Sequence, residues 1–62
     1  MINNYLITDI FEKKSRSSKL SSQMIYGEKF KIIKTYKNWL KIKTLYDNYN
    51  GYIKKKDFRK TG

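Results

Sequence analysis

Apolar and polar residues alternate along two stretches in the middle of the chain, residues 29–35 (KFKIIKT) and 39–43 (WLKIK). A period of two is typical of β-strands that bury one face, because successive side chains of a strand point to opposite sides. The short Lys37–Asn38 segment between them predicts a hairpin turn, since Asn tolerates the left-handed region of backbone space. The alternation assigns four side chains to the core: Phe30, Ile32, Leu40 and Ile42.

Trp39 falls on the opposite face of its strand, beside Lys41 and Lys43. We therefore expect its indole ring to be solvent-accessible. A large aromatic ring outside the core is more informative than a buried one. Two interpretations stay open: the ring is the floor of a ligand groove, or it covers the end of a small barrel beside Tyr36.

The first twenty-two residues predict a short strand region followed by a loop. Residues 5–12 hold β-prone runs in which Leu6 and Ile10 are expected to face inward. Residues 13–22 (KKSRSSKLSS) are serine-rich and basic, and only Leu20 among them could be buried. This composition predicts a long exposed loop.

Three tyrosines gather near the end of the chain, in residues 46–52 (YDNYNGY). Rigid rings with polar tips, beside amide and carboxylate groups, are typical of peptide and sugar sites. A structural alternative is a wide hairpin, with its turn at Asp47–Asn48 and a bulge at Gly51. The alternative explains the turn but not why three tyrosines lie so close together.

The composition excludes most catalytic and metal sites. Sixty-two residues make one domain at most. Without cysteine or histidine, the usual zinc sites and the Cys–His and Ser–His catalytic pairs are excluded. We therefore expect no enzyme activity, metal or cofactor in this chain. No signal peptide or transmembrane segment is visible, so we expect no membrane insertion, and the compartment, cytoplasmic or cell-envelope, follows from the parent protein.

The net charge of +10 indicates an anionic partner. Nucleic acid, an acidic membrane surface and an anionic cell-wall polymer all fit such an excess. Solvated lysines with no partner fit it too. Thirteen of the fifteen basic residues are lysine, whereas dedicated nucleic-acid sites favour arginine. A small barrel that binds single-stranded nucleic acid through aromatic stacking and a lysine track is the alternative function.

Several short segments occur in a recognisable order: Ser22-Gln23, Tyr26-Gly27-Glu28, Trp39, Ile42, Asp47 and Gly51-Tyr52-Ile53. Together they resemble the bacterial SH3-like domain. More narrowly, they resemble the version at the N-terminus of NlpC-type cell-wall cysteine peptidases. The resemblance covers roughly residues 5–58, and it is the order and spacing of the segments, rather than any one of them, that carries it.

The resemblance implies a barrel of five or six antiparallel strands. Residues 13–22 would be its long first loop, residues 23–28 its diverging turn, and Lys56–Phe58 a short 3₁₀ turn before the last strand. It also implies a non-catalytic module that binds peptidoglycan stem peptide or shapes the cleft of an adjoining papain-like catalytic domain. An aromatic ring and a carboxylate suit the free ammonium group of such a peptide. The candidate ligand-binding residues are Trp39, Tyr46, Asp47, Tyr49 and Glu12.

The chain departs from proline-binding SH3 domains in two places. Residues 54–57 (KKKD) stand where a proline and a tyrosine would follow the Gly-Tyr-Ile strand, and the long loop is basic rather than acidic. An anionic partner is therefore expected in place of a proline-rich one. We expect residues 1–62 to form one barrel, a fragment or N-terminal module of a longer peptidase, with residues 60–62 starting a linker.

Overall fold

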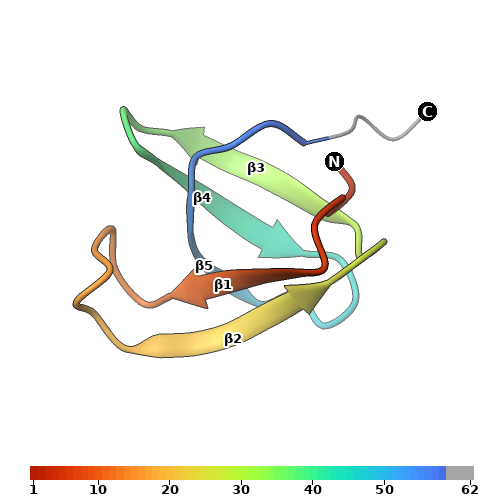
Figure 1. Cartoon of the computed structure of the whole chain (residues 1–62), viewed down its shortest axis with the longest axis horizontal. Helices are drawn as coiled ribbons and strands as arrows, with labels where there is room; N and C mark the ends of the chain where they lie inside the picture. The colour runs from red at the N-terminus through yellow and green to blue at the C-terminus, as the bar shows by residue number, and fades with distance from the viewer. Residues whose placement is uncertain (59–62) are drawn as a thin grey trace.

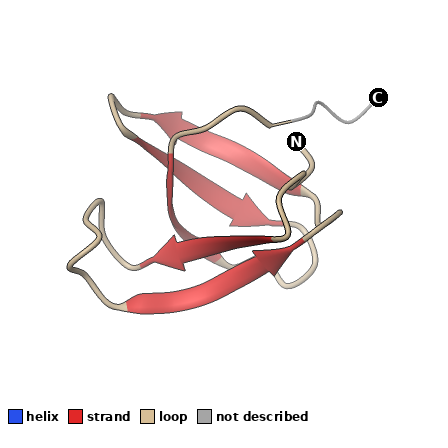
Figure 2. Cartoon of the chain, in the orientation of Figure 1, coloured by secondary structure: helices blue, strands red, loops and turns tan. Residues whose placement is uncertain are grey.

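The computed structural model describes residues 1–58 and shows a strongly bent antiparallel sheet (Figures 1 and 2). Its five strands run in the spatial order β2-β1-β5-β4-β3. Their bounds are β1 Ile7–Phe11, β2 Leu20–Ile25, β3 Phe30–Thr35, β4 Trp39–Thr44 and β5 Asn50–Lys54. The predicted fold class, a small all-β SH3-like barrel, is confirmed. No helix occurs in residues 1–58, and so none there is long and apolar enough to cross a membrane.

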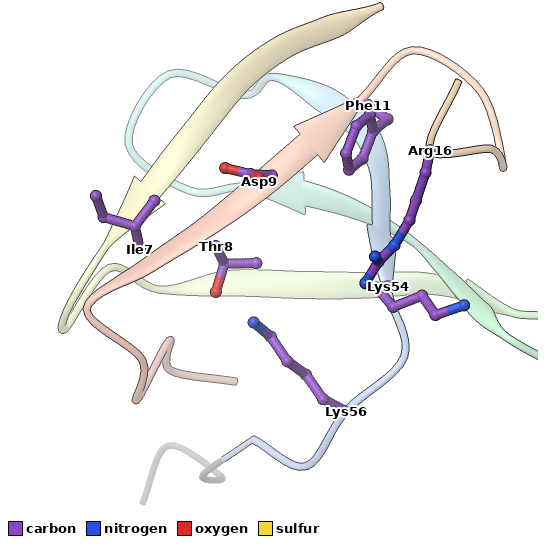
Figure 3. Close-up of a pocket in the computed structure, with 7 residues that line it drawn as sticks. All are labelled: Ile7, Thr8, Asp9, Phe11, Arg16, Lys54 and Lys56. Carbon is purple, nitrogen blue, oxygen red and sulfur yellow. The ribbon is translucent and has the colours of Figure 1, made fainter. Parts of the chain in front are cut away.

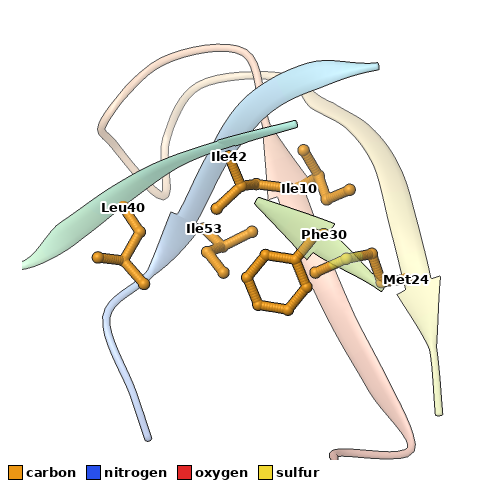
Figure 4. Close-up of a cluster of buried hydrophobic side chains, with 6 residues drawn as sticks. All are labelled: Ile10, Met24, Phe30, Leu40, Ile42 and Ile53. Carbon is orange, nitrogen blue, oxygen red and sulfur yellow. The ribbon is translucent and has the colours of Figure 1, made fainter. Parts of the chain in front are cut away.

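The core lies inside the bend of the sheet, where every strand contributes at least one side chain (Figure 4). Leu40 lies opposite Ile53, and Ile42 opposite Gly51, so β4 and β5 point the same face inward. The predictions for Ile10, Phe30, Leu40 and Ile42 are confirmed, since all are buried. The buried cluster is completed by two residues that the alternation did not single out: Met24 and Ile53.

Strand β3 departs from strict alternation because it contains a bulge. Ile32 lies opposite Ile42, but the next pair is Lys34 with Lys41, which leaves Ile33 as an extra residue. The prediction that Ile32 belongs to the core is wrong, since 36% of the residue is exposed. As β3 is the outermost strand on its side, no neighbouring strand covers that side chain.

The first three residues close the gap between the two outer strands. Met1 exchanges hydrogen bonds with the backbone of Phe30, and Asn3 bonds to the backbone at Gly27 and Glu28. The Asn3 side chain is fully buried and donates to the carbonyls of Met24 (3.1 Å) and Ile25 (2.9 Å) at the end of β2. The sheet is thereby completed into a barrel.

Two predictions for the first twenty residues are wrong. Leu6 is 84% exposed, because it lies in a bend before β1 and the alternation of a strand does not apply to it. The loop is shorter than expected: β2 begins at Leu20, which pairs with Phe11 and is 47% exposed. The remaining loop, residues 12–19, is held by internal hydrogen bonds such as Ser18 Oγ to the Ser15 carbonyl, 2.6 Å.

The turns follow the chemistry of their residues. Gly27 has a φ of 88°, in the region that favours glycine, and the Glu28 carboxylate caps this turn by accepting from the Ile25 N–H (2.6 Å). Asn48 takes a φ of 55° in the β4–β5 connection. Gly51 is not a bulge, since it pairs regularly with Ile42.

The chain after β5 packs across one end of the barrel. The ring of Phe58 contacts those of Phe30 and Tyr5 edge-on, with centroid distances of 4.9 and 5.5 Å. The Tyr5 hydroxyl donates to the Asp57 carbonyl, 2.8 Å. Residues 56–58 are irregular rather than the 3₁₀ turn expected, and the expected linker at residues 60–62 lies outside the described part of the chain.

Candidate ligand-binding groove

A groove opens where β1 and β5 diverge. The two strands meet at one residue pair, Phe11 with Tyr52, and the earlier residues of β1 are not paired with β5 (Figure 1). The space between them is a cavity of about 380 Å³. Figure 3 shows the residues that line the groove: Ile7, Thr8, Asp9, Phe11, Arg16, Lys54 and Lys56.

Charge in the groove is arranged as one acid among three bases. Asp9 is the single carboxylate among the lining residues, with Arg16, Lys54 and Lys56 as the bases. Gln23 on β2 orients the carboxylate by donating from Nε2 to Asp9 Oδ1, 2.8 Å. A ligand that carries both anionic and cationic groups would find a partner for each.

Lys56 is partly withdrawn from solvent. Its ammonium lies 4.0 Å from the centre of the Tyr5 ring, a cation–π contact. Partial burial lowers the pKa of Lys56 from its ordinary value, and the negative charge of Asp9 acts in the opposite direction. The Lys56 side chain is thus held over the groove rather than extended into water.

Trp39 does not line the groove, but it packs against Phe11, which does. Its parity is as predicted, facing away from the core, but the prediction that it is solvent-accessible is wrong, since it is 9% exposed. Phe11 of β1 packs edge-on against it, with ring centroids 5.6 Å apart at 89°. The ammonium of Lys54 lies 5.5 Å from the ring centre. The alternation of residues within one strand cannot predict a contact with another strand that is distant in the sequence.

Two further tyrosines lie beside this pair. The rings of Tyr36 and Tyr52 are 6.2 Å apart and tilted by 53°. Loop 12–19 brings the Lys14 ammonium to 3.9 Å from the Tyr36 ring centre, and Lys34 lies 5.4 Å from it. Phe11, Tyr36, Trp39 and Tyr52 are here called the aromatic cluster, and ammonium groups lie over two of its rings, those of Tyr36 and Trp39.

The structure places the other candidate residues outside the groove. Tyr46 is 90% exposed and lies in a second hollow with Leu45 and Lys29. Asp47 accepts a hydrogen bond from the Thr44 hydroxyl, which fixes the β4–β5 connection. The two remaining candidates are Tyr49 and Glu12.

Tyr49 and Glu12 also lie outside the groove, each in a different environment. Tyr49 is half-buried against the core, and its backbone N–H donates to the Thr44 hydroxyl, 3.0 Å. Glu12 is exposed at the start of the long loop, where its N–H bonds to the Lys19 carbonyl. The three tyrosines of residues 46–52 are consequently not one cluster: Tyr46 is exposed, Tyr49 faces the core, and Tyr52 joins the aromatic cluster.

Sequence reasoning missed Asp9, Arg16, Lys54 and Lys56 as groove residues. A signal for Asp9 was present, because Ile10 was expected to face inward and its neighbour in the strand must then point outward. No comparable signal existed for Arg16, which lies in an irregular loop. In chemical terms the groove offers charges, a hydroxyl and apolar surface, which suit binding.

Comparison with known proteins gives one result. Residues 10–58 match the family model described as the bacterial dipeptidyl-peptidase SH3 domain. Searches of curated proteins and of solved structures found no match. The matched span includes Phe11, Arg16, Lys54 and Lys56 of the groove, and it begins one residue after Asp9.

Proposed function

Because the chain belongs to the family of bacterial dipeptidyl-peptidase SH3 domains, we propose that it is the non-catalytic recognition module of a peptidoglycan stem-peptide hydrolase. In this proposal, hydrolysis belongs to an adjoining papain-like domain of the NlpC type. The module binds the stem peptide in the groove and presents it to that domain. Small SH3 domains of this bacterial type are typically non-catalytic, which agrees with such a division of labour.

The observation that carries the proposal is the charge arrangement of the groove. A stem peptide bears several carboxylates and at least one ammonium group. Arg16 can hold a carboxylate through two parallel N–H donors, and Lys54 adds a mobile positive charge. Asp9 is the matching acid for an ammonium group. The apolar floor of Ile7 and Phe11 provides a surface for the short aliphatic side chains of the peptide.

The alternative, stacking of single-stranded nucleic acid, has less support. It requires aromatic faces that bases can reach. Trp39 is buried under Phe11, and the Tyr36 ring carries an ammonium at 3.9 Å. The well-exposed Tyr46 lies outside the aromatic cluster.

A titration of the ¹⁵N-labelled chain with a soluble muropeptide tests the proposal. We expect amide shifts concentrated at Ile7, Asp9, Phe11 and Lys54. Asp9→Asn removes the acid with little change of shape, and we expect the dissociation constant to rise at least about tenfold, since a hydrogen bond to a charged group contributes about 1.5–3 kcal/mol.

Glu12→Gln is the matched control for Asp9→Asn. It also removes one negative charge, but Glu12 does not line the groove, so its effect on affinity should stay below twofold. Shifts confined to Tyr46 and its neighbours, or equal losses in the two variants, would contradict the placement of the site. An absence of any shift with muropeptide would contradict the proposed ligand.

A further inference from the structure

Four lysines form two directly opposed pairs across β3 and β4. Lys31 lies opposite Lys43, and Lys34 lies opposite Lys41. Facing Cβ atoms of an antiparallel pair are about 4.5–5.5 Å apart, and the two pairs follow one another along β4 at about 7 Å. These four residues are here called the lysine face.

The bulge at Ile33 brings the two pairs together. In a regular strand, Lys34 would share the parity of Ile32 and point to the inner side of the sheet. The extra residue shifts the register, so that Ile32 still lies opposite Ile42 while Lys34 lies opposite Lys41. A bulge that re-aims a side chain in this way is a recurrent device next to functional surfaces.

The positive charge of the lysine face is not balanced by acidic residues on its own two strands or on the adjoining β5. Strands β3, β4 and β5 contain no aspartate or glutamate. On the β5 side, Lys41 and Lys43 lie opposite Tyr52 and Asn50, neither of which carries a carboxylate. Like charges placed directly opposite each other on a sheet are destabilising. A bound polyanion would relieve that repulsion and gain affinity from doing so.

We infer that the lysine face binds the backbone of a flexible, linear phosphodiester polymer, at a site separate from the groove. The face is only two lysines wide, which suits a chain better than a plane of charges. Lysine holds phosphate as a point charge and needs no fixed fork geometry, unlike arginine. Because Trp39 is buried and the Lys14 ammonium lies over the neighbouring Tyr36 ring, the polymer is held mainly by charge. This chemistry favours a polyol-phosphate chain over a nucleic acid, whose bases would require free stacking surfaces.

Salt dependence of binding provides the first test, with delipidated poly(glycerol phosphate) as the probe. For a single-stranded polyanion, log K falls with log[salt] at a slope of about −0.7 per neutralised phosphate. Four lysines therefore predict a slope of about −3. Lys34→Gln combined with Lys41→Gln should halve the slope and weaken binding at least tenfold in 50 mM salt.

A second double variant controls for net charge. Lys19→Gln with Lys55→Gln removes the same two charges from positions outside the three strands, and we expect it to weaken binding threefold at most. Equal losses in the two double variants would overturn the inference, as would an absence of binding to the polymer. Tighter binding of oligothymidylate than of poly(glycerol phosphate) would also overturn it, in favour of nucleic acid.

A charge reversal gives a readout that a loss of folding cannot mimic. Lys31→Glu places a carboxylate opposite Lys43, so the melting temperature should rise while polymer affinity falls at least fivefold. Lys55→Glu makes the same change of net charge with no lysine facing it across a strand, and should leave affinity within about twofold. A melting temperature lowered by Lys31→Glu, or polymer affinity that it leaves intact, would show that the opposed pairs do not form the binding site.

Discussion

The replacement Gly51→Ala should be severely destabilising, because β1 crosses β5 at this residue with no room for a side chain. An ideal Cβ at position 51 would lie 2.3 Å from Ile10 Cγ2 and 3.3 Å from the Phe11 carbonyl oxygen. Carbon atoms in contact prefer a separation of about 3.5–4.0 Å, so one strand must move by more than about 1 Å. Ile10 is fully buried and β-branched, so its χ1 rotamers are restricted and it has little freedom to move aside.

The magnitude follows from the cost of overpacking. Inserting a methyl group into a packed core costs about 1–3 kcal/mol, and an overlap with a rigid buried side chain belongs at the upper end. A 62-residue domain has a total stability of about 3–9 kcal/mol. We therefore expect a loss of about 2–3 kcal/mol, and a melting temperature lowered by about 10–20 °C.

Urea unfolding followed by Trp39 fluorescence and by circular dichroism measures this loss. Ile10→Leu moves the branch point away from Cβ and so removes the clashing γ2 methyl at nearly constant volume. In the double variant, Gly51→Ala should therefore cost at least 1 kcal/mol less than it does alone.

Gly27→Ala is the control that distinguishes a steric clash, expected at Gly51, from backbone strain. No atom lies within 4 Å of a Cβ built at Gly27, but its φ of 88° disfavours alanine. Its cost should be unchanged by Ile10→Leu. A loss below 0.5 kcal/mol for Gly51→Ala, or costs that add independently with Ile10→Leu, would refute the reasoning from the crossing.

Two smaller predictions concern side chains that hold distant parts of the chain together. Asn3→Ala should cost about 1–3 kcal/mol in urea unfolding, because it leaves the buried hydroxyl of Thr8 without the acceptor it now has at 2.8 Å. Asn4→Ala is the adjacent control and should be nearly neutral, since Asn4 Oδ1 has no hydrogen-bond partner among residues 1–58; equal losses at both positions would contradict the assignment. Phe11→Ala should uncover Trp39, shifting its fluorescence emission to longer wavelength and making it accessible to iodide quenching, and an unchanged spectrum would mean that Phe11 does not shield it.

Local alternation was sufficient to predict the β3–β4 hairpin and most of its core residues. Phe30, Leu40 and Ile42 follow a period of two, and their burial depends only on which face of the strand is apolar. The prediction for Ile32 failed because exposure also depends on the position of the strand in the sheet. In an outermost strand that contains a bulge, a side chain on the inward face can remain partly exposed. Neither the edge position nor the bulge can be read from KFKIIKT alone.

The site was harder to predict because long-range pairing assembles it. Asp9 and Lys56 are separated by nearly the whole chain, yet both line the groove because β1 and β5 are neighbours in the sheet. The exposure of Trp39 was misjudged for the same reason, since Phe11 covers it from another strand. The sequence indicated a basic recognition surface, but its location required the order of the strands.

By closing the barrel, Met1–Asn3 also cover part of the two outer strands of the sheet. Outer strands present unpaired N–H and C=O groups, which can template pairing with another chain and so promote aggregation. Here the hydrogen bonds from residues 1–3 occupy the last residues of β2, the Gly27 turn and the first residue of β3. Any change that displaces these three residues would uncover the end of β2 and the start of β3 at once, so we expect solubility as well as stability to depend on residues 1–3.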